Sequence, residues 1–431
     1  MKKLRLILLL LPAFLYACSD EITEKLENVN YSQNGCVISI DEAISIAIEQ
    51  SQNFPQEATS RSSVTRTANS KNVIVRKNLS RSGSEPSYYI VNFDDAQGYA
   101  IVPAINIGEQ ILGFVPHGTY PTASNPALEE YLNRADEYIA QQASIGIDFP
   151  NPPIGPLEPI PMEPIHDTLF VDTNYFYHLE PRVPQEWGQD NFYGIECPNG
   201  VTGCSPLAMA TITVWTHFKS GIISSRIKYS YEGRKLDYED ITWAELYKHR
   251  WVAGKVNNKE REHLCYTTDP ENVHKSISRL CRQIGEDAKT IYRYTPPSPQ
   301  SETDNDMLVP VLRKYIPSSY TVKDFVDYDY LHVNYYIDRG LLLMSGRYNE
   351  TDYGHTWIAD GYRIASIKYT DVKNFNHPTI PPTTKVYTKN YCLIHMRWGY
   401  HGDGDGYFTG DVLTVNKDKF SDIRYIAVYN E

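Results

Sequence analysis

The sequence predicts an α+β protein made of two folded parts. Its 431 residues are too many for one small core and suggest roughly two to three domains. Before residue 145, a helix pattern, several apolar runs of strand length and a second helix pattern follow one another. A proline-rich segment then separates this part from an aromatic, strand-rich remainder.

Residues 1–17 have the pattern of a signal peptide. A basic start precedes an apolar run from Leu6 to Tyr16 that is too short to span a bilayer comfortably. The run ends in L-Y-A-C, which resembles a bacterial lipobox, so Cys18 is predicted to carry a lipid after cleavage. A plain secretory signal with an incidental cysteine is the alternative. Both predict export, and the lipobox predicts an envelope lipoprotein of the outer membrane or cell surface, with residues 18–35 as a tether.

Residues 36–145 are predicted to form a small α+β domain. The spacing from Ser39 to Glu42 is that of a capping box before the apolar face of a helix. Asn125 and Pro126 place a cap and a first-turn proline ahead of a second helix, which runs to Ala143. Between the helices, three apolar runs predict a small antiparallel meander: 88–93, 98–104 and 111–115.

A proline-rich linker is predicted over residues 146–182. Seven of the fifteen residues from Pro150 to Pro164 are proline, which favours an extended, protease-accessible chain. A cut that frees the two folded parts is expected between about Asp148 and Pro181. Because proline resists many proteases, the range Ile165–Leu179 is the narrower prediction.

Residues 183–431 are predicted to form the second folded part. The net charge of −12 and the lack of a stripe of Lys and Arg exclude a nucleic-acid-binding surface. Three helices are expected: Ser205–Phe218, Val273–Gly285 and Asp306–Tyr315.

The cysteines after Cys18 are sparse and irregularly spaced, so most are expected to be small buried hydrophobic residues. The sequence has no CxxC or HxxxH pair, which disfavours zinc. The sequence leaves the disulfide status of five cysteines open: Cys36, Cys197, Cys265, Cys281 and Cys392.

Cys204 is the exception, because it opens the predicted helix in GCSPLAMATITVW (203–215). A thiolate at a helix N-terminus is stabilised by unpaired backbone N–H groups, which lowers its pKa and makes it nucleophilic. A buried, inert cysteine at a helix start is the alternative. His355, in YGHTWIADGY (353–362), is the candidate base, and Gly354 is expected to expose it at the head of a strand and to border the substrate.

Two further segments complete the predicted site. Gln189 lies fifteen residues before Cys204 and offers an amide to a developing oxyanion. Trp398 opens a glycine-rich segment, RWGYHGDGDGYF (397–408). In the order Gln, Cys, His, Trp, these residues resemble the streptopain family of papain-like cysteine peptidases.

The resemblance covers most of the chain. It implies a papain-like peptidase domain with Cys204 as nucleophile, His355 as base, Gln189 in the oxyanion hole and Trp398 shielding the histidine. NFDDAQGYAIVPA (92–104) and EQILGFVPHGTYP (109–121) look like the family's inhibitory propeptide. The implied protein is a cysteine endopeptidase made as a zymogen, with peptide substrates, its own propeptide as inhibitor and no metal or organic cofactor.

The chain departs from the family at Arg397, where the family commonly has Asn. Arginine cannot accept a hydrogen bond from an imidazole N–H. Either Asp360 or a backbone carbonyl is left to orient His355, and Asp360 equally suits a strand-end turn. Asp403 and Asp405 alone supply too few ligands for calcium and indicate a flexible flap instead.

Two non-enzymatic alternatives remain. The first is a catalytically silent family member that binds peptides or inhibits a partner peptidase through residues 36–145. The second is a polysaccharide-binding surface lipoprotein, which only the 34 tyrosines favour. Reaction of Cys204 with a thiol alkylator separates both from the enzyme.

Overall fold

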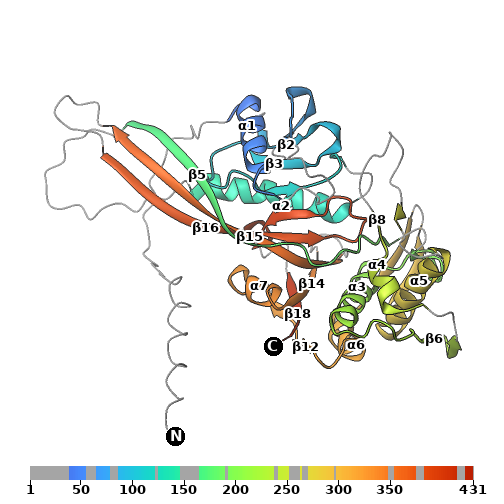
Figure 1. The fold of residues 1–431 in the computed structure, drawn as a ribbon. Helices are drawn as coiled ribbons and strands as arrows, with labels where there is room; N and C mark the ends of the chain where they lie inside the picture. Colours follow the sequence, from blue (N-terminus) through green and yellow to red (C-terminus); the bar gives the residue numbers. More distant parts are fainter. Residues whose placement is uncertain are drawn as a thin grey trace, which may run out of the picture. The chain divides into compact units, whose positions relative to one another are not determined.

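The computed structural model describes thirteen stretches of the chain: 38–54, 65–77, 86–121, 125–145, 165–189, 193–236, 241–251, 263–264, 270–295, 298–347, 354–374, 383–414 and 423–430 (Figure 1). All of them belong to the compact unit Gly35–Glu431. The predicted signal peptide, Cys18 and the tether lie outside the described residues, as do Cys36 and Cys265. Among the described helices, none is both long and apolar enough to cross a bilayer.

One antiparallel sheet of twelve strands runs through the described chain. Ten of its strands follow the order β1-β2-β3-β4-β17-β16-β15-β14-β18-β12, while β5 pairs with β15 and β13 pairs with β18. The strands are β1 (Val73–Lys77), β2 (Pro86–Asn92), β3 (Tyr99–Pro103), β4 (Gly113–Val115), β5 (Ile165–Leu179), β12 (Thr321–Val322), β13 (Val326–Asp327), β14 (Gly340–Arg347), β15 (Gly354–Asn374), β16 (Thr383–Arg397), β17 (Gly406–Thr409) and β18 (Arg424–Tyr429).

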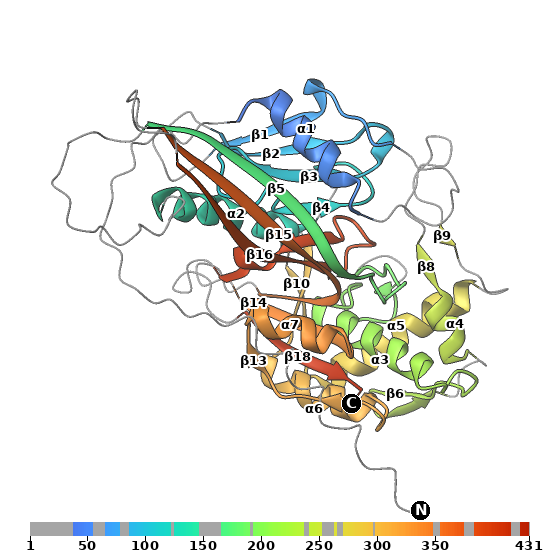
Figure 2. The ribbon, with the colours of Figure 1, turned by 60° about the vertical axis from the view of Figure 1, so that its left-hand side comes forward.

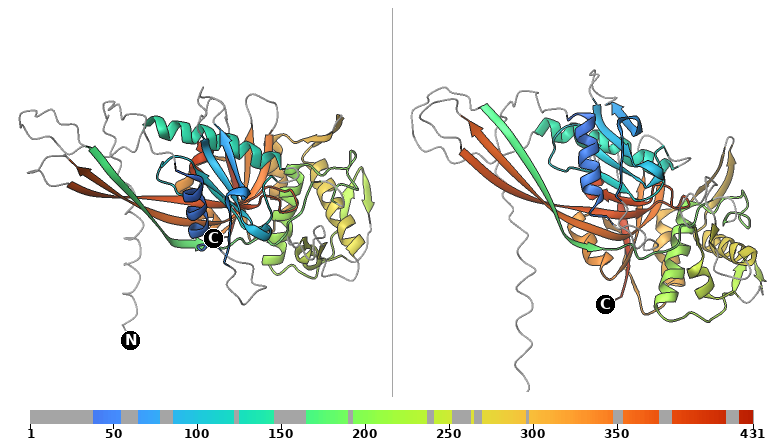
Figure 3. Two further views of the ribbon diagram at one scale, coloured as in Figure 1. Left: turned by 90° about the horizontal axis from the view of Figure 1, so that it is seen from above. Right: turned by 45° about the horizontal axis from the view of Figure 1, so that its top comes forward.

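The predicted N-terminal domain is present as a meander covered by a helix on each face. Helix α1 (Ile40–Ser51) is capped by Ser39, whose hydroxyl accepts a hydrogen bond from the backbone N–H of Glu42, one of the two bonds of the predicted capping box. Helix α2 (Pro126–Ile145) is likewise capped by Asn125. Alternate residues of β2 and β3 pack in separate clusters with α1 and α2, so the meander is buried on both faces (Figure 3).

This meander continues into the C-terminal half through β4 and β17. Phe114 of β4 pairs with Tyr407 of β17, and Gly113 pairs with Phe408. The backbone N–H of Thr409 extends the ladder by donating to the Leu112 carbonyl. The two halves of the chain therefore share one hydrogen-bonded sheet as well as apolar clusters.

Strand β5 differs from the sequence-based expectation. The prediction places Ile165–Leu179 in the linker, whereas the structure has these residues in a strand that pairs with Tyr362–Asn374 of β15. The segment contains no proline and is rich in Leu, Phe, Tyr, Val and Thr, which favour strands. Strands β5, β15 and β16 run side by side over a long distance (Figures 1 and 2).

The C-terminal half packs helices against this sheet. Helix α3 (Cys204–Lys219) is buried along most of its length, with α4 (Trp243–Lys248), α5 (Pro270–Asp287) and α6 (Leu308–Tyr315) around it and β14 and β15 beneath it. All three helices predicted here are present. The remaining elements are α7 (Tyr330–Ile337), the pairs β6 (Tyr229–Tyr231) with β7 (Arg234–Leu236), β8 (Arg250–Trp251) with β9 (His263–Leu264) and β10 (Ile291–Thr295) with β11 (Ser298–Glu302), and the 3-10 turns 70–72, 94–96, 305–307 and 410–414.

Candidate active site

Cys204 is the first residue of α3, and the residue before it must be glycine. Gly203 has a φ of +84°, a conformation that residues with a Cβ rarely adopt. A Cβ at this position would also lie 2.2 Å from the Ser301 hydroxyl. The turn thus brings Cys204 to the helix N-terminus, where its side chain is partly accessible and free of any disulfide.

His355 lies near the start of β15 and is buried, with 2% of its surface exposed. Its ring stacks with those of Trp357 and Tyr400, at centroid distances of 6.1 and 5.6 Å. Gly354 is itself exposed at the strand end but does not expose His355, so that part of the prediction is wrong. The stacked aromatic rings cover the histidine instead, and a contact of Gly354 with substrate stays a prediction.

The two ring nitrogens of His355 have different surroundings. Nε2 lies 2.8 Å from the main-chain carbonyl oxygen of Trp398 and is placed to donate a hydrogen bond to it. Nδ1 is buried and has no oxygen or nitrogen partner among the described residues. This leaves Nδ1 as the nitrogen that can exchange a proton with a thiol.

The surroundings of Cys204 favour its thiolate form. Burial alone raises the pKa of the thiol, but hydrogen bonding and the charge of His355 lower it, followed by the Thr356 backbone and the Ser205 hydroxyl. The net result is a pKa of about 7, below the usual value for cysteine. Cys197 and Cys392 show the opposite behaviour, since burial raises the pKa of each to about 12. Along with Cys281 they are free, buried thiols, as predicted.

A hydrogen bond joins the elements that carry Cys204 and His355. The hydroxyl oxygens of Ser205, on α3, and Thr356, on β15, are 2.8 Å apart and both side chains are buried. A small cavity adjoins this contact and is lined by Trp187, Cys204, Leu207, Thr356, Trp357 and Arg397, among others.

Gln189 lies on the segment that leads to the loop before Cys204. Its main-chain carbonyl accepts a hydrogen bond of 2.8 Å from the Thr202 N–H. The neighbouring Gly188 pairs with Tyr400, and a Cβ there would lie 2.0 Å from the His401 ring. The main chain of Gln189 is thus close to the nucleophile's loop, while the oxyanion role of its side chain stays a prediction.

Trp398 is buried and held by the glycine-rich segment that follows it. Its indole N–H donates to the Gly404 carbonyl at 3.0 Å, and its ring packs against Trp357 and Phe408. The shielding role predicted for the ring stays a prediction. The sequence left two candidates for orienting His355, Asp360 and a backbone carbonyl. The structure has the carbonyl, that of Trp398, hydrogen-bonded to Nε2 of His355.

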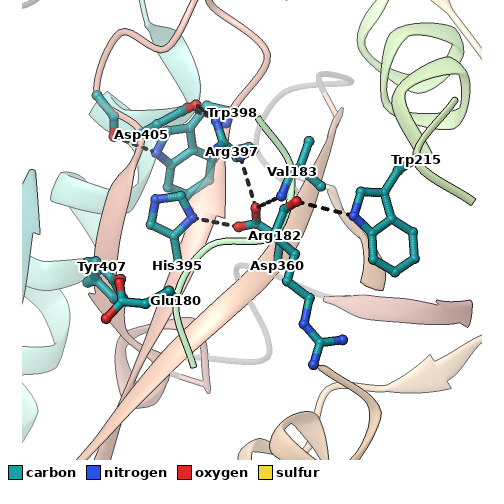
Figure 4. A network of polar contacts seen from close by, with 11 residues as sticks. Glu180, Arg182, Val183, Trp215, Asp360, His395, Arg397, Trp398, Asp405 and Tyr407 are labelled. Atoms are coloured by element: carbon teal, nitrogen blue, oxygen red, sulfur yellow. Dashed lines mark hydrogen bonds and ion pairs between the residues drawn. The ribbon is translucent and has the colours of Figure 1, made fainter. Parts of the chain in front are cut away.

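Arg397 and Asp360 point into a buried polar network (Figure 4). Arg397 donates from Nε to Asp360 at 3.0 Å and from a terminal nitrogen to Asp405 at 3.4 Å. Asp360 also lies 2.6 Å from Nδ1 of His395. Asp360 therefore neither orients His355 directly nor holds a strand-end turn, because its carboxylate is engaged by the arginine and the second histidine.

Sequence reasoning missed several of these partners. Ser205 and Thr356 each follow a predicted catalytic residue, and that position was the only signal for them. His395 and Asp405 carried no signal that linked them to Asp360 and Arg397, because the bulge between Ala359 and Gly361 sets which residues meet. Asp405 was considered only as part of a flap, yet it is buried in the network.

The N-terminal domain contacts the glycine-rich segment beside the site. The side-chain amide of Asn125 donates to the Asp403 carbonyl at 2.6 Å, while its oxygen caps α2. A Cβ on Gly404 would lie within 3.4 Å of Tyr99, Asn125 and Leu128. Residues of the predicted propeptide thus pack directly on the loop that carries Trp398.

Each half of the chain matches the model of a known protein family. A model of the peptidase C10 family matches residues 187–408, and a model of the Spi protease inhibitor matches residues 36–139. No curated protein sequence matched the chain.

Two solved structures from Prevotella intermedia are similar to the chain. A prointerpain A fragment, a cysteine-to-alanine mutant, is 16% identical with a TM-score of 0.48 over 83% of this chain and 99% of the fragment. The active wild-type interpain A cysteine protease is 16% identical with a TM-score of 0.37 over 59% and 95%. The peptidase model alone spans more than half of the sequence. The chain therefore belongs to the peptidase C10 family, the streptopain family of cysteine peptidases, and carries a propeptide domain of the Spi inhibitor type before its peptidase domain.

Proposed function

We propose that the protein is an exported, lipid-anchored cysteine endopeptidase, made as a zymogen, in which Cys204 and His355 form the catalytic pair. The observation that carries the proposal is the placement of Cys204 at the N-terminus of α3, which the Ser205–Thr356 contact joins to the strand that carries His355, whose Nε2 is bound to a backbone carbonyl. A thiol pKa lowered to about 7 agrees with this placement. A thiolate–imidazolium pair near neutral pH is what nucleophilic attack on a peptide bond requires.

The proposed reaction proceeds through an acyl-enzyme. The Cys204 thiolate attacks the peptide carbonyl carbon, and the carbonyl electron pair moves to oxygen. Gln189 and the Cys204 backbone N–H hold this oxyanion. The imidazolium of His355 gives its proton to the leaving amine as the C–N bond breaks. Water, deprotonated by His355, then attacks the thioester carbonyl. The C–S bond breaks, which releases the carboxylic acid and restores the Cys204 thiolate and the His355 imidazolium.

Latency is proposed to come from the N-terminal domain. Its β4 pairs with β17, and Asn125 binds the loop that carries Trp398. A covalently attached inhibitor also acts at a high effective concentration, since it cannot diffuse away. The full-length chain is therefore expected to hydrolyse peptides poorly until the linker is cut.

Alkylation of Cys204 tests the proposal. Stoichiometric labelling, followed by mass spectrometry of peptides, should accompany loss of peptide hydrolysis in the processed protein. Cys204→Ala and His355→Ala should each abolish hydrolysis and leave the melting temperature within a few degrees of wild type. Cys197→Ala is the matched control, because its thiol is buried with a raised pKa. Turnover by purified Cys204→Ala would refute the proposal, and an unreactive Cys204 would favour the catalytically silent alternative.

A further inference from the structure

We infer that Asp405, paired with Arg397, which Asp360 holds in turn, is a positioning residue that sets the orientation of His355 through the main chain of Trp398. The inference rests on the proposed function. It assigns a role to Asp405, Arg397 and Asp360 (Figure 4), of which Arg397 and Asp405 line the same small cavity as Cys204 and Arg397 stands where the family commonly has asparagine.

Asp405 fixes the peptide group that leads into Trp398. One carboxylate oxygen accepts the Trp398 backbone N–H at 2.8 Å, and the other lies 3.4 Å from a terminal nitrogen of Arg397. The side chain is buried, with 8% of the residue exposed. Burial raises the pKa of Asp405, and Arg397 and the Trp398 N–H oppose that rise.

Arg397 and Asp360 make this arrangement rigid. Asp360 is fully buried and accepts hydrogen bonds from Arg397, His395 and the Val183 backbone N–H, at 3.0, 2.6 and 2.9 Å. Burial alone would raise the pKa of Asp360, but Arg397 and His395 hold it well below its usual value. Glu186 adds a further negative charge that acts on the arginine. Arg397 is thus tied to both carboxylates, so Asp360 limits how far the arginine can move away from Asp405.

Three hydrogen bonds fix the position of Trp398. Asp405 holds its backbone N–H, the Gly404 carbonyl holds its indole N–H, and its own carbonyl receives Nε2 of His355. By accepting the Nε2–H, this carbonyl fixes the orientation of the imidazole ring and with it the position of Nδ1, the nitrogen that can exchange a proton with the thiol. The position of Asp405 therefore governs how well His355 stabilises the Cys204 thiolate.

Two substitutions of Asp405 separate the effect of its hydrogen-bond geometry from the effect of its charge. Asp405→Asn keeps an oxygen at the same reach from the Trp398 N–H and removes the charge. Asp405→Glu keeps the charge and displaces the oxygen by one methylene. The full-length proteins are treated with iodoacetamide from pH 5 to pH 10, and the rate of Cys204 alkylation is followed by mass. Processed forms of the same proteins are assayed for kcat and KM.

If Asp405 positions His355, Asp405→Glu should alkylate about tenfold more slowly at pH 6.5, with the inflection moved to higher pH, and should lose about tenfold in kcat at similar KM. Asp405→Asn should stay within about threefold of wild type, because it preserves the positioning hydrogen bond. Arg363→Ala is the control, since it removes a buried arginine that pairs with Glu180 at 2.7 Å on the same sheet. It should leave the inflection unchanged.

Three outcomes would overturn the inference. Wild-type behaviour of Asp405→Glu is one, and an equal or larger loss in Asp405→Asn is another. A shifted inflection in Arg363→Ala is the third, because it would indicate a general loss of stability. Should Asp405→Glu fail to fold cooperatively, Asp405→Asn decides alone, and a tenfold loss there refutes positioning. An unreactive, inactive wild-type protein would instead refute the proposed function.

Discussion

The hydroxyl oxygens of Ser205 and Thr356 lie 2.8 Å apart, and each residue directly follows a member of the proposed catalytic pair. The contact joins the first turn of α3 to the start of β15, two elements about 150 residues apart in the chain. The contact therefore holds the residues next to Cys204 and His355 in register.

This contact predicts a non-additive pair of mutations. Ser205→Ala or Thr356→Val alone leaves one buried hydroxyl without its partner and should destabilise the protein by about 1–3 kcal/mol. The double mutant should cost less than the sum, because no orphaned hydroxyl remains. Urea unfolding of all four proteins measures the coupling. Thr211→Val is the control, since that hydroxyl bonds within its own helix, to the Leu207 carbonyl. Strict additivity would contradict the prediction.

The lowered pKa of Cys204 predicts a pH dependence of its reactivity. The thiolate is the reactive form, so the alkylation rate should rise through about pH 7 and level off above it. In His355→Ala the inflection should move upward, because burial then acts without the opposing charge. The pKa of the Cys204 thiol is lower in the folded state than in the unfolded state. Ionisation of this thiol therefore stabilises the fold at alkaline pH, and the contribution is lost as pH falls through about 7. An inflection that stays near pH 7 in His355→Ala would show that the histidine does not act on the thiol.

Gln189→Ala tests the predicted oxyanion hole. Removal of one donor should lower kcat by about a hundredfold or more and leave KM nearly unchanged, since the bond strengthens only in the transition state. Steady-state kinetics on the processed protein measure both constants. Gln185→Ala is a useful comparison, because its amide donates to the Tyr247 carbonyl instead. An effect of Gln189→Ala confined to KM would move the residue out of the oxyanion role.

Cys18→Ser tests the lipid anchor. A serine at this position cannot form the thioether that carries the lipid, so fatty-acid labelling should disappear and the protein should leave the membrane fraction. Metabolic labelling and fractionation of the producing cells measure both effects. Cys36→Ser serves as the control, because it lies outside the lipobox. Unchanged membrane retention of Cys18→Ser would mean that the lipobox reading is wrong.

The structure of β5 changes the expected activation cut. Proteases cut exposed backbone that is free of ladder hydrogen bonds, whereas Ile165–Leu179 is paired with β15 along its whole length. The cut is therefore expected between about Asp148 and Pro164, and the peptidase should keep β5 at its new N-terminus. N-terminal sequencing of the processed form measures this. A new N-terminus between Val171 and Pro181 would contradict it.

Much of the fold could be predicted from the sequence because local signals were strong. The caps at Ser39 and Asn125, the apolar runs of the meander and the helix after Gly203 are encoded by neighbouring residues. The length and partner of β5 could not be predicted, because a strand without a hairpin turn gives no sign of where it pairs.

The same distinction applies to the candidate site. Cys204, His355 and Trp398 lie in recognisable local contexts, and the structure brings them together. The ion pairs of Arg397 depend on a bulge in β15 and on a turn of positive-φ residues that includes Gly402 and Gly404. The bulge and the turn fix where the side chains of β15, β16 and the glycine-rich segment point, and no single stretch of sequence encodes that arrangement.

The pairing of β4 with β17 has a consequence for the processed enzyme. Once the N-terminal domain departs, Gly406–Thr409 becomes an open sheet edge that includes Tyr407 and Phe408, both buried in the full-length chain. Open, apolar edges recruit strands from other molecules and promote aggregation. The isolated peptidase domain should therefore be sparingly soluble when produced alone, and co-expression with residues 36–145 as a separate chain should restore soluble protein by supplying the missing strand.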